Sequence, residues 1–220
     1  MMKTIFIACP KNNPSQTIFV AHMAIALCFT FKTALVKIAL ASDDIEMFLA
    51  KRYHISLKKN INLPTPAYFQ FSKNLFKDLQ NEYACLIADA QNCDHTENAD
   101  ILVVPAFDDD DIKALIDHNS PFATMIWTAK KNRAKTGKDA FKCVVLPLET
   151  LDDQKLTKTA PMMGYIIGPK LQKNDVYKKG FEQGITALDK DLPDFSKDFK
   201  ADDFFARRNL KKIIEYILSL

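Results

Sequence analysis

Residues 11–17, Lys-Asn-Asn-Pro-Ser-Gln-Thr, occupy the place of a phosphate-binding loop but carry few of its groups. They lie between a short apolar run at 5–9 and a longer one that begins near residue 16. Strand, loop and helix in this order are the context in which phosphate loops occur. Such a loop holds nucleotide phosphates with backbone N–H groups and a lysine, and binds magnesium through a hydroxyl. Thr17 offers the hydroxyl, whereas Gln16 stands where the lysine is expected.

The loop also lacks the residues that would let it wrap a phosphate. No glycine occurs before Gly137, and glycine lets consecutive N–H groups turn inward. Asn12 and Asn13 tolerate left-handed conformations better than most residues, so they preserve part of the turn. Pro14 removes one donor. The sequence therefore predicts a nucleotide-binding frame whose binding groups are mostly missing.

The elements that must position this loop follow from the hydrophobic pattern. Several short runs are apolar on both faces and alternate with helical patterns, which predicts an α/β fold with a mostly parallel sheet covered on both sides. We expect one domain over residues 1–220, with a loop or linker at 53–68. The expected strands are 5–9, 33–40, 83–88, 99–105, 123–127, 142–146 and 164–168, and the expected helices are 16–31, one from about 44, 73–82, 108–118 and 204–219.

Composition limits the class of protein. The net charge of +3 is mild and does not by itself demand a nucleic-acid partner. Five cysteines without a Cys-x-x-Cys pair indicate reduced, buried thiols rather than a disulfide framework or a zinc site. The apolar run at 17–31 is too short to span a bilayer, and the last helix lacks a strongly basic face. We expect a cytoplasmic protein with no membrane partner.

Segments along nearly the whole chain resemble the ParA/MinD group of deviant Walker-A ATPases, and within it MipZ, which positions the bacterial division site. The family loop Lys-Gly-Gly-x-Gly-Lys-[Ser/Thr]-Thr falls on residues 11–18, where Lys11 matches its signature lysine. The further matching segments are 21–27, 33–39, 48–52, 86–90, 99–105, 126–134, 176–189 and 206–210. The resemblance implies a P-loop NTPase fold, ATP and magnesium as cofactors, a nucleotide-sandwich homodimer, nonspecific DNA binding and partners in division or partition.

The acidic positions of that family are also changed. The two aspartates after the second family strand correspond to Lys37 and Ala39, and the Walker-B aspartate corresponds to Ala88. Asp89 follows one residue late, and in a strand a one-residue shift turns a side chain to the opposite face. We therefore expect Asp89 to be a poor substitute unless the strand ends there.

Loss of the phosphate lysine together with these carboxylates removes both charge neutralisation and water positioning. The leading hypothesis is a MipZ/ParA-like regulator of division or partitioning that acts by binding partners, with ATP binding and hydrolysis weakened or lost. It has no catalytic residue, and no cofactor unless the loop still accepts ATP and magnesium. Two alternatives stay open: a working ATPase with a rebuilt loop, and an interaction module unrelated to division. The degenerate loop positions are Lys11, Asn12, Asn13, Gln16 and Thr17.

Other polar groups have competing interpretations. A basic segment is either a solvated loop or a contact for DNA or an acidic partner; it contains Lys130, Lys131, Arg133, Lys135 and Lys138. The aspartates at 108–111 suit the start of a helix better than a metal site. The four scattered histidines are not expected to bind metal, and Trp127 is expected in the core.

Overall fold

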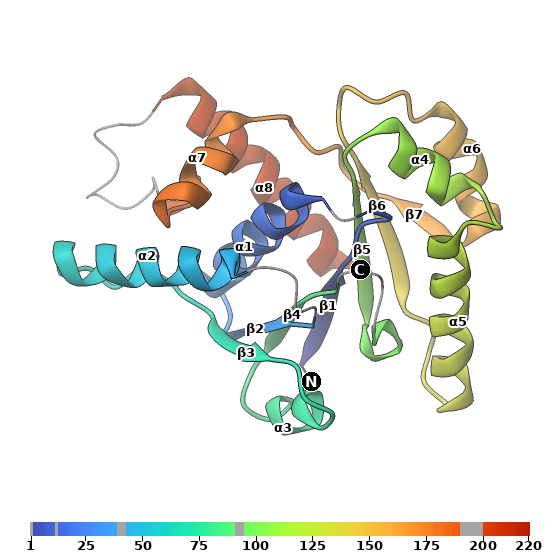
Figure 1. Cartoon of the computed structure of the whole chain (residues 1–220), viewed down its shortest axis with the longest axis horizontal. Helices are drawn as coiled ribbons and strands as arrows, with labels where there is room; N and C mark the ends of the chain where they lie inside the picture. Colours follow the sequence, from blue (N-terminus) through green and yellow to red (C-terminus); the bar gives the residue numbers. More distant parts are fainter. Residues whose placement is uncertain (1, 12, 39–42, 91–94, 190–199) are drawn as a thin grey trace.

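The computed structural model describes residues 2–11, 13–38, 43–90, 95–189 and 200–220. Its centre is a seven-stranded sheet in the order β3-β2-β4-β1-β5-β6-β7, in which every pairing is parallel (Figure 1). The predicted α/β class is confirmed. The strands are β1 (Lys3–Ile7), β2 (Thr33–Lys37), β3 (Ala67–Gln70), β4 (Cys85–Asp89), β5 (Ile101–Ala106), β6 (Lys142–Pro147) and β7 (Tyr165–Ile167).

Helices cover both faces of the sheet (Figure 1). Strand side chains alternate between two large apolar clusters: Ile5 and Ile7 pack on the face of α1 and α8, while Phe6 packs on the face of α5. The helices are α1 (Pro14–Cys28), α2 (Asp44–Lys59), α3 (Leu75–Leu79), the short 3₁₀ helix η2 (Thr96–Asn98), α4 (Asp109–Ile116), α5 (Pro121–Lys135), α6 (Gln154–Met163), α7 (Asp175–Gln183) and α8 (Ala201–Ser219).

The carboxyl ends of three central strands meet at one point of the sheet edge. In the register of β4, Asp89 lies opposite Ile7 of β1 on one side and Lys37 of β2 on the other. The chain leaves β1 here and enters α1. Because ligands of open parallel sheets bind at the carboxyl edge, this is where the degenerate loop must be tested.

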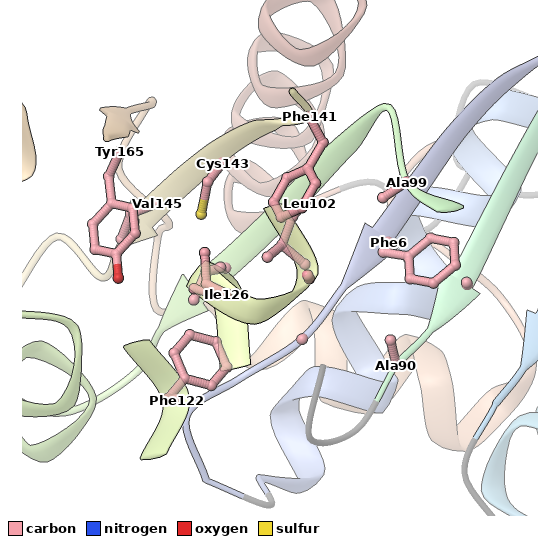
Figure 2. Close-up of a cluster of buried hydrophobic side chains, with 14 of the residues drawn as sticks. Phe6, Ala90, Ala99, Leu102, Phe122, Ile126, Phe141, Cys143, Val145 and Tyr165 are labelled. Atoms are coloured by element: carbon pink, nitrogen blue, oxygen red, sulfur yellow. The ribbon is translucent and has the colours of Figure 1, made fainter. Parts of the chain in front are cut away.

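The strand predicted at 123–127 is wrong, and so is the basic loop after it. Residues 123–127 and the basic residues up to Lys135 belong to α5, on which Phe122 and Ile126 face the core (Figure 2). Trp127, predicted to be buried, is 52% exposed. A five-residue apolar run fits a strand or a helix equally well by periodicity alone. The decisive signal was Ser120 followed by Pro121, an N-cap and a first helical residue.

The loop predicted at 53–68 is also partly wrong. Helix α2 continues to Lys59, and β3 begins at Ala67 as an edge strand. The two prolines of this stretch, Pro64 and Pro66, lie in the connection between them. Apolar and charged residues are mixed on the exposed half of α2 and hid its periodicity, and β3 is only four residues long.

A buried ion pair anchors α2 to the chain that follows α7. Arg52 and Asp189 are both fully buried, and the guanidinium donates two hydrogen bonds of 2.6 and 2.7 Å to the two carboxylate oxygens. Arg52 also donates to the carbonyl of Pro64, and Asp189 accepts from the backbone N–H and the hydroxyl of Thr186. The pair is therefore bidentate and further hydrogen-bonded, the arrangement that compensates buried charge best.

The cap of α5 gives a first expected result. The Ser120 hydroxyl accepts a hydrogen bond from the Ala123 N–H at 3.1 Å, so Ser120→Ala should lower the free energy of unfolding by about 1 kcal/mol. Denaturant titration followed by circular dichroism measures this loss. Ser120→Thr keeps the hydroxyl and should retain most of the stability; an equal loss in both variants would contradict a capping role.

Candidate functional site

The first backbone N–H groups of α1 are bonded to groups of their own chain. Asn13 is the N-cap, and its Oδ1 accepts from the Ser15 N–H at 2.9 Å. Pro14 has no N–H, and the Gln16 N–H donates to the Asn13 carbonyl at 2.9 Å. Helix N-termini bind phosphate through these first free N–H groups. The first three N–H positions of α1 offer no such donor, because two are used internally and the third is absent.

Gln16, at the position of the phosphate lysine, points into the protein. It is 3% exposed, and its Nε2 donates to the Ile7 carbonyl at 3.2 Å and to Asp89 Oδ1 at 2.6 Å. The side chain thus ties α1 to β1 and β4 and carries no charge. Thr17 is also buried. This group does not fit a triphosphate, which needs cationic or N–H donors facing it.

Asp89 was expected to be a poor substitute for the Walker-B aspartate because it would point away from the loop, and the structure corrects that expectation. It lies on the α1 face of β4 and contacts Gln16, whereas Ala88 packs on the opposite face beside Phe6. Ala88, which the resemblance aligns with the Walker-B aspartate, therefore faces the helices on the other side of the sheet. Asp89 faces the loop. Burial raises the pKa of Asp89 to about 6, against the lowering by its hydrogen bond from Gln16 and by Lys37.

Lys37 forms ion pairs within a second polar network, at the same carboxyl edge of the sheet as Asp89. Its Nζ lies 3.3 Å from Glu46 Oε1 and 3.6 Å from Asp43 Oδ1. The Tyr68 hydroxyl donates to the same Glu46 oxygen. Where the resemblance aligns a family carboxylate, this chain places a lysine that is neutralised by Glu46 of α2 and by Asp43 at the N-cap of that helix. Ala39 and Asn12, two other positions of the degenerate motif, lie outside the described residues.

Lys11 pairs within its own chain. Its Nζ lies 2.6 Å from Asp110 Oδ2, in an exposed ion pair at the start of α4. Of the neighbouring aspartates, Asp108 accepts from the Asp111 N–H, and Asp111 accepts from the Phe107 N–H. The structure thus gives two members of the acidic run the helix-capping role that was expected.

A cavity of about 310 Å³ opens beside the start of α1. Helices α1, α7 and α8 line it with the connections that follow β5, β6 and β7, and its walls include the rings of Phe19, Phe107 and Tyr177. His22 also lines it; the ring Nε2 is 2.9 Å from the Tyr177 carbonyl, and burial lowers the pKa of His22 to about 4. The space suits a small, mostly apolar ligand.

The basic segment divides into structural and surface residues. Arg133 is buried, and donates to Asp100 Oδ1 and to the carbonyls of Glu97 and Asp139. Lys130 donates to the Gly164 carbonyl after α6. Three members remain exposed for a partner or DNA: Lys131, Lys135 and Lys138. A buried arginine of this kind could not be told from its neighbours by charge alone.

No cluster of three or more His, Cys, Asp or Glu able to hold a metal ion occurs among the described residues. Within the same residues, no helix combines the length and apolar character needed to span a membrane.

Comparison with known families gives one match, to the family described as ATPase MipZ, over residues 88–219. The matched part starts at the end of β4 and covers more than half of the chain. It leaves out the loop at 11–17. A search of curated proteins found no significant match.

Solved structures share the fold across almost the full chain. Apo McdA from Cyanothece is 15% identical with a TM-score of 0.59, covering 99% of this chain and 100% of its own. A ParA family ATPase from Chlorobium tepidum is 14% identical with a TM-score of 0.60, covering 99% of both chains. MinD in the MinC:MinD complex of Aquifex aeolicus is 13% identical with a TM-score of 0.58, covering 94% of this chain and 95% of its own. The fold is that of the ParA/MinD ATPases.

Proposed function

This chain belongs to the ATPase MipZ family, and on that premise we propose that it regulates cell division or chromosome partitioning by binding partners, with ATP binding and hydrolysis weakened or lost. One observation carries the second half of the proposal. Gln16 fills the lysine position with a neutral, buried side chain bonded to Ile7 and Asp89. Asn13 and Pro14 leave the start of α1 without its phosphate-facing donors.

Protein partners are the first expectation. The similar MinD structure is a complex with MinC, and another similar chain is a plasmid partition protein of Borrelia burgdorferi bound to AMPPNP, 10% identical with a TM-score of 0.59. By analogy we propose a partner from the division or partition machinery. Nonspecific DNA is a second candidate partner, through Lys131, Lys135 and Lys138, and its binding would weaken steeply with salt.

Calorimetric titration with ATP and magnesium tests the proposal. We expect no saturable heat, because neutral Gln16 replaces the phosphate lysine, Lys11 is paired with Asp110, and the first N–H groups of α1 are used or absent. Light scattering should show the same mass with and without nucleotide. The Borrelia burgdorferi protein, whose structure holds AMPPNP, is the positive control. Saturable binding, or a monomer-to-dimer shift caused by ATP, would contradict the proposal.

The competing function is a working ATPase with a rebuilt loop. One observation favours it: the Asp89 carboxylate faces the loop and contacts Gln16. On this hypothesis the protein shows ATP turnover that Lys11→Ala abolishes. This hypothesis predicts saturable ATP binding in the calorimetric titration, so the same experiment separates the two functions.

A further inference from the structure

Helix α2 carries an exposed seam with the spacing of a coiled coil. Met47, Ala50, His54 and Leu57 recur at intervals of three and four residues on its outer side, and Tyr53 borders them. Met47, Tyr53 and Leu57 are 51%, 61% and 60% exposed. Positions a and d of two heptads have this spacing, whereas single exposed apolar residues would need no explanation.

The opposite side of α2 is fixed, so the seam cannot turn inward. Ile45, Phe48 and Arg52 are the buried residues of the helix. Arg52 is held by Asp189, and Gly184 approaches so closely that a Cβ there would lie 2.7 Å from the Arg52 nitrogen. Figure 1 shows α2 at the periphery of the molecule, beyond α1 and α7. The seam is therefore presented outward by a rigidly held helix.

Charge along α2 is complementary to a reversed copy of itself. Its first turn holds Asp44 and Glu46, and its last turn holds Lys58 and Lys59. An antiparallel pairing that stacks Met47 on the partner copy's Leu57 also brings Asp44 beside the second copy's Lys58, twice by symmetry. The same register sets the two copies of Tyr53 against each other on one flank of the two-fold axis. On the other flank the two copies of Lys51 meet, and each Lys51 Nζ is held by the Glu182 carbonyl of its own chain. The helix dipoles then run in opposite directions, which is the favourable arrangement.

We propose that α2 is a self-association surface, on which a second copy of this chain docks its own α2 antiparallel without any nucleotide. The seam shares no residue with the degenerate loop, and the inference does not depend on the proposed function. Two heptads form a small interface, so the dimer is weak and concentration-dependent.

Sedimentation velocity over a wide concentration range, without nucleotide, tests the seam. The sedimentation coefficient should rise with concentration in the native protein and stay at the monomer value in Leu57→Lys. Met162→Lys is the matched control, because Met162 is 76% exposed on α6, away from α2; it should associate like the native protein. A concentration-independent monomer, or equal loss in both variants, would overturn the proposal.

Charge exchange tests the register. Lys58→Glu and Asp44→Lys should each weaken self-association about tenfold, since two attractive pairs become repulsive. An equimolar mixture of the two variants should regain association, because each acidic end then meets a basic one. Circular dichroism verifies that both variants fold. Failure of the mixture to recover would reject the antiparallel dimer, and association seen only with ATP would instead contradict the proposed function.

Discussion

Replacement of Asp189 by alanine should lower the free energy of unfolding by about 3–5 kcal/mol. The change leaves the Arg52 guanidinium charged and fully buried, and the acceptors that remain among the described residues are the carbonyls of Pro64 and Gly184. It also removes the carboxylate that holds the Thr186 N–H and hydroxyl. This is a large share of the stability of a typical domain.

Denaturant titration at neutral pH measures the loss. Lys113→Ala is the matched control, because it breaks an ion pair with Asp110 in which both side chains are more than half exposed; its unfolding midpoint should stay near that of the native protein. The double variant Arg52→Met with Asp189→Leu removes both charges together and should recover much of the stability. A loss in Asp189→Ala as small as in Lys113→Ala would show that the pair does not anchor α2.

Asp89→Asn is expected to stabilise the protein above pH 6 by about 2–3 kcal/mol. The pKa of Asp89 is raised to about 6 by burial, from an ordinary value near 3.8. A raised carboxyl pKa means that the folded state holds the proton more tightly than the unfolded state. Stability therefore falls as the pH rises from about 4 to about 6, and the full cost of the buried charge remains above that range. The amide oxygen of asparagine still accepts from Gln16.

Urea titrations at several pH values between 4 and 8 check this result. The difference in unfolding free energy between Asp89→Asn and the native protein should grow as the pH rises and level off above 6. Asp109→Asn, an exposed change at the start of α4, should not reproduce that growth. A difference that stays constant across this range would show that Asp89 ionises at its ordinary pKa.

The fold was largely predictable because the strands of the sheet are continuous apolar runs. Residues 85–88 and 143–146 of two such runs are buried between the helices on the two faces, which explains their continuous apolar composition. Helix α5 was missed because its apolar run is too short to distinguish the periodicity of a helix from that of a strand. Helix α2 was shortened because its outer face mixes apolar and charged residues.

The candidate site was half predictable. Loss of glycine and lysine from the loop is visible in the sequence, and the placement of Gln16 agrees with a loop that does not face phosphate. The role of Asp89 was not predictable, because it depends on which face of β4 looks toward α1. The Arg52–Asp189 pair joins residues 137 positions apart, and only the packing of α2 against the chain after α7 brings them together.

The capped start of α1 bears on how the protein responds to the cell's energy supply. A protein that binds a nucleotide only when folded gains stability by mass action as the nucleotide concentration rises. Here Asn13 caps the start of α1 and Gln16 ties it to Asp89, through contacts within the chain itself. The start of α1 is thus ordered by groups whose local concentration never changes. Under the proposed function, the persistence of the folded protein is uncoupled from ATP abundance.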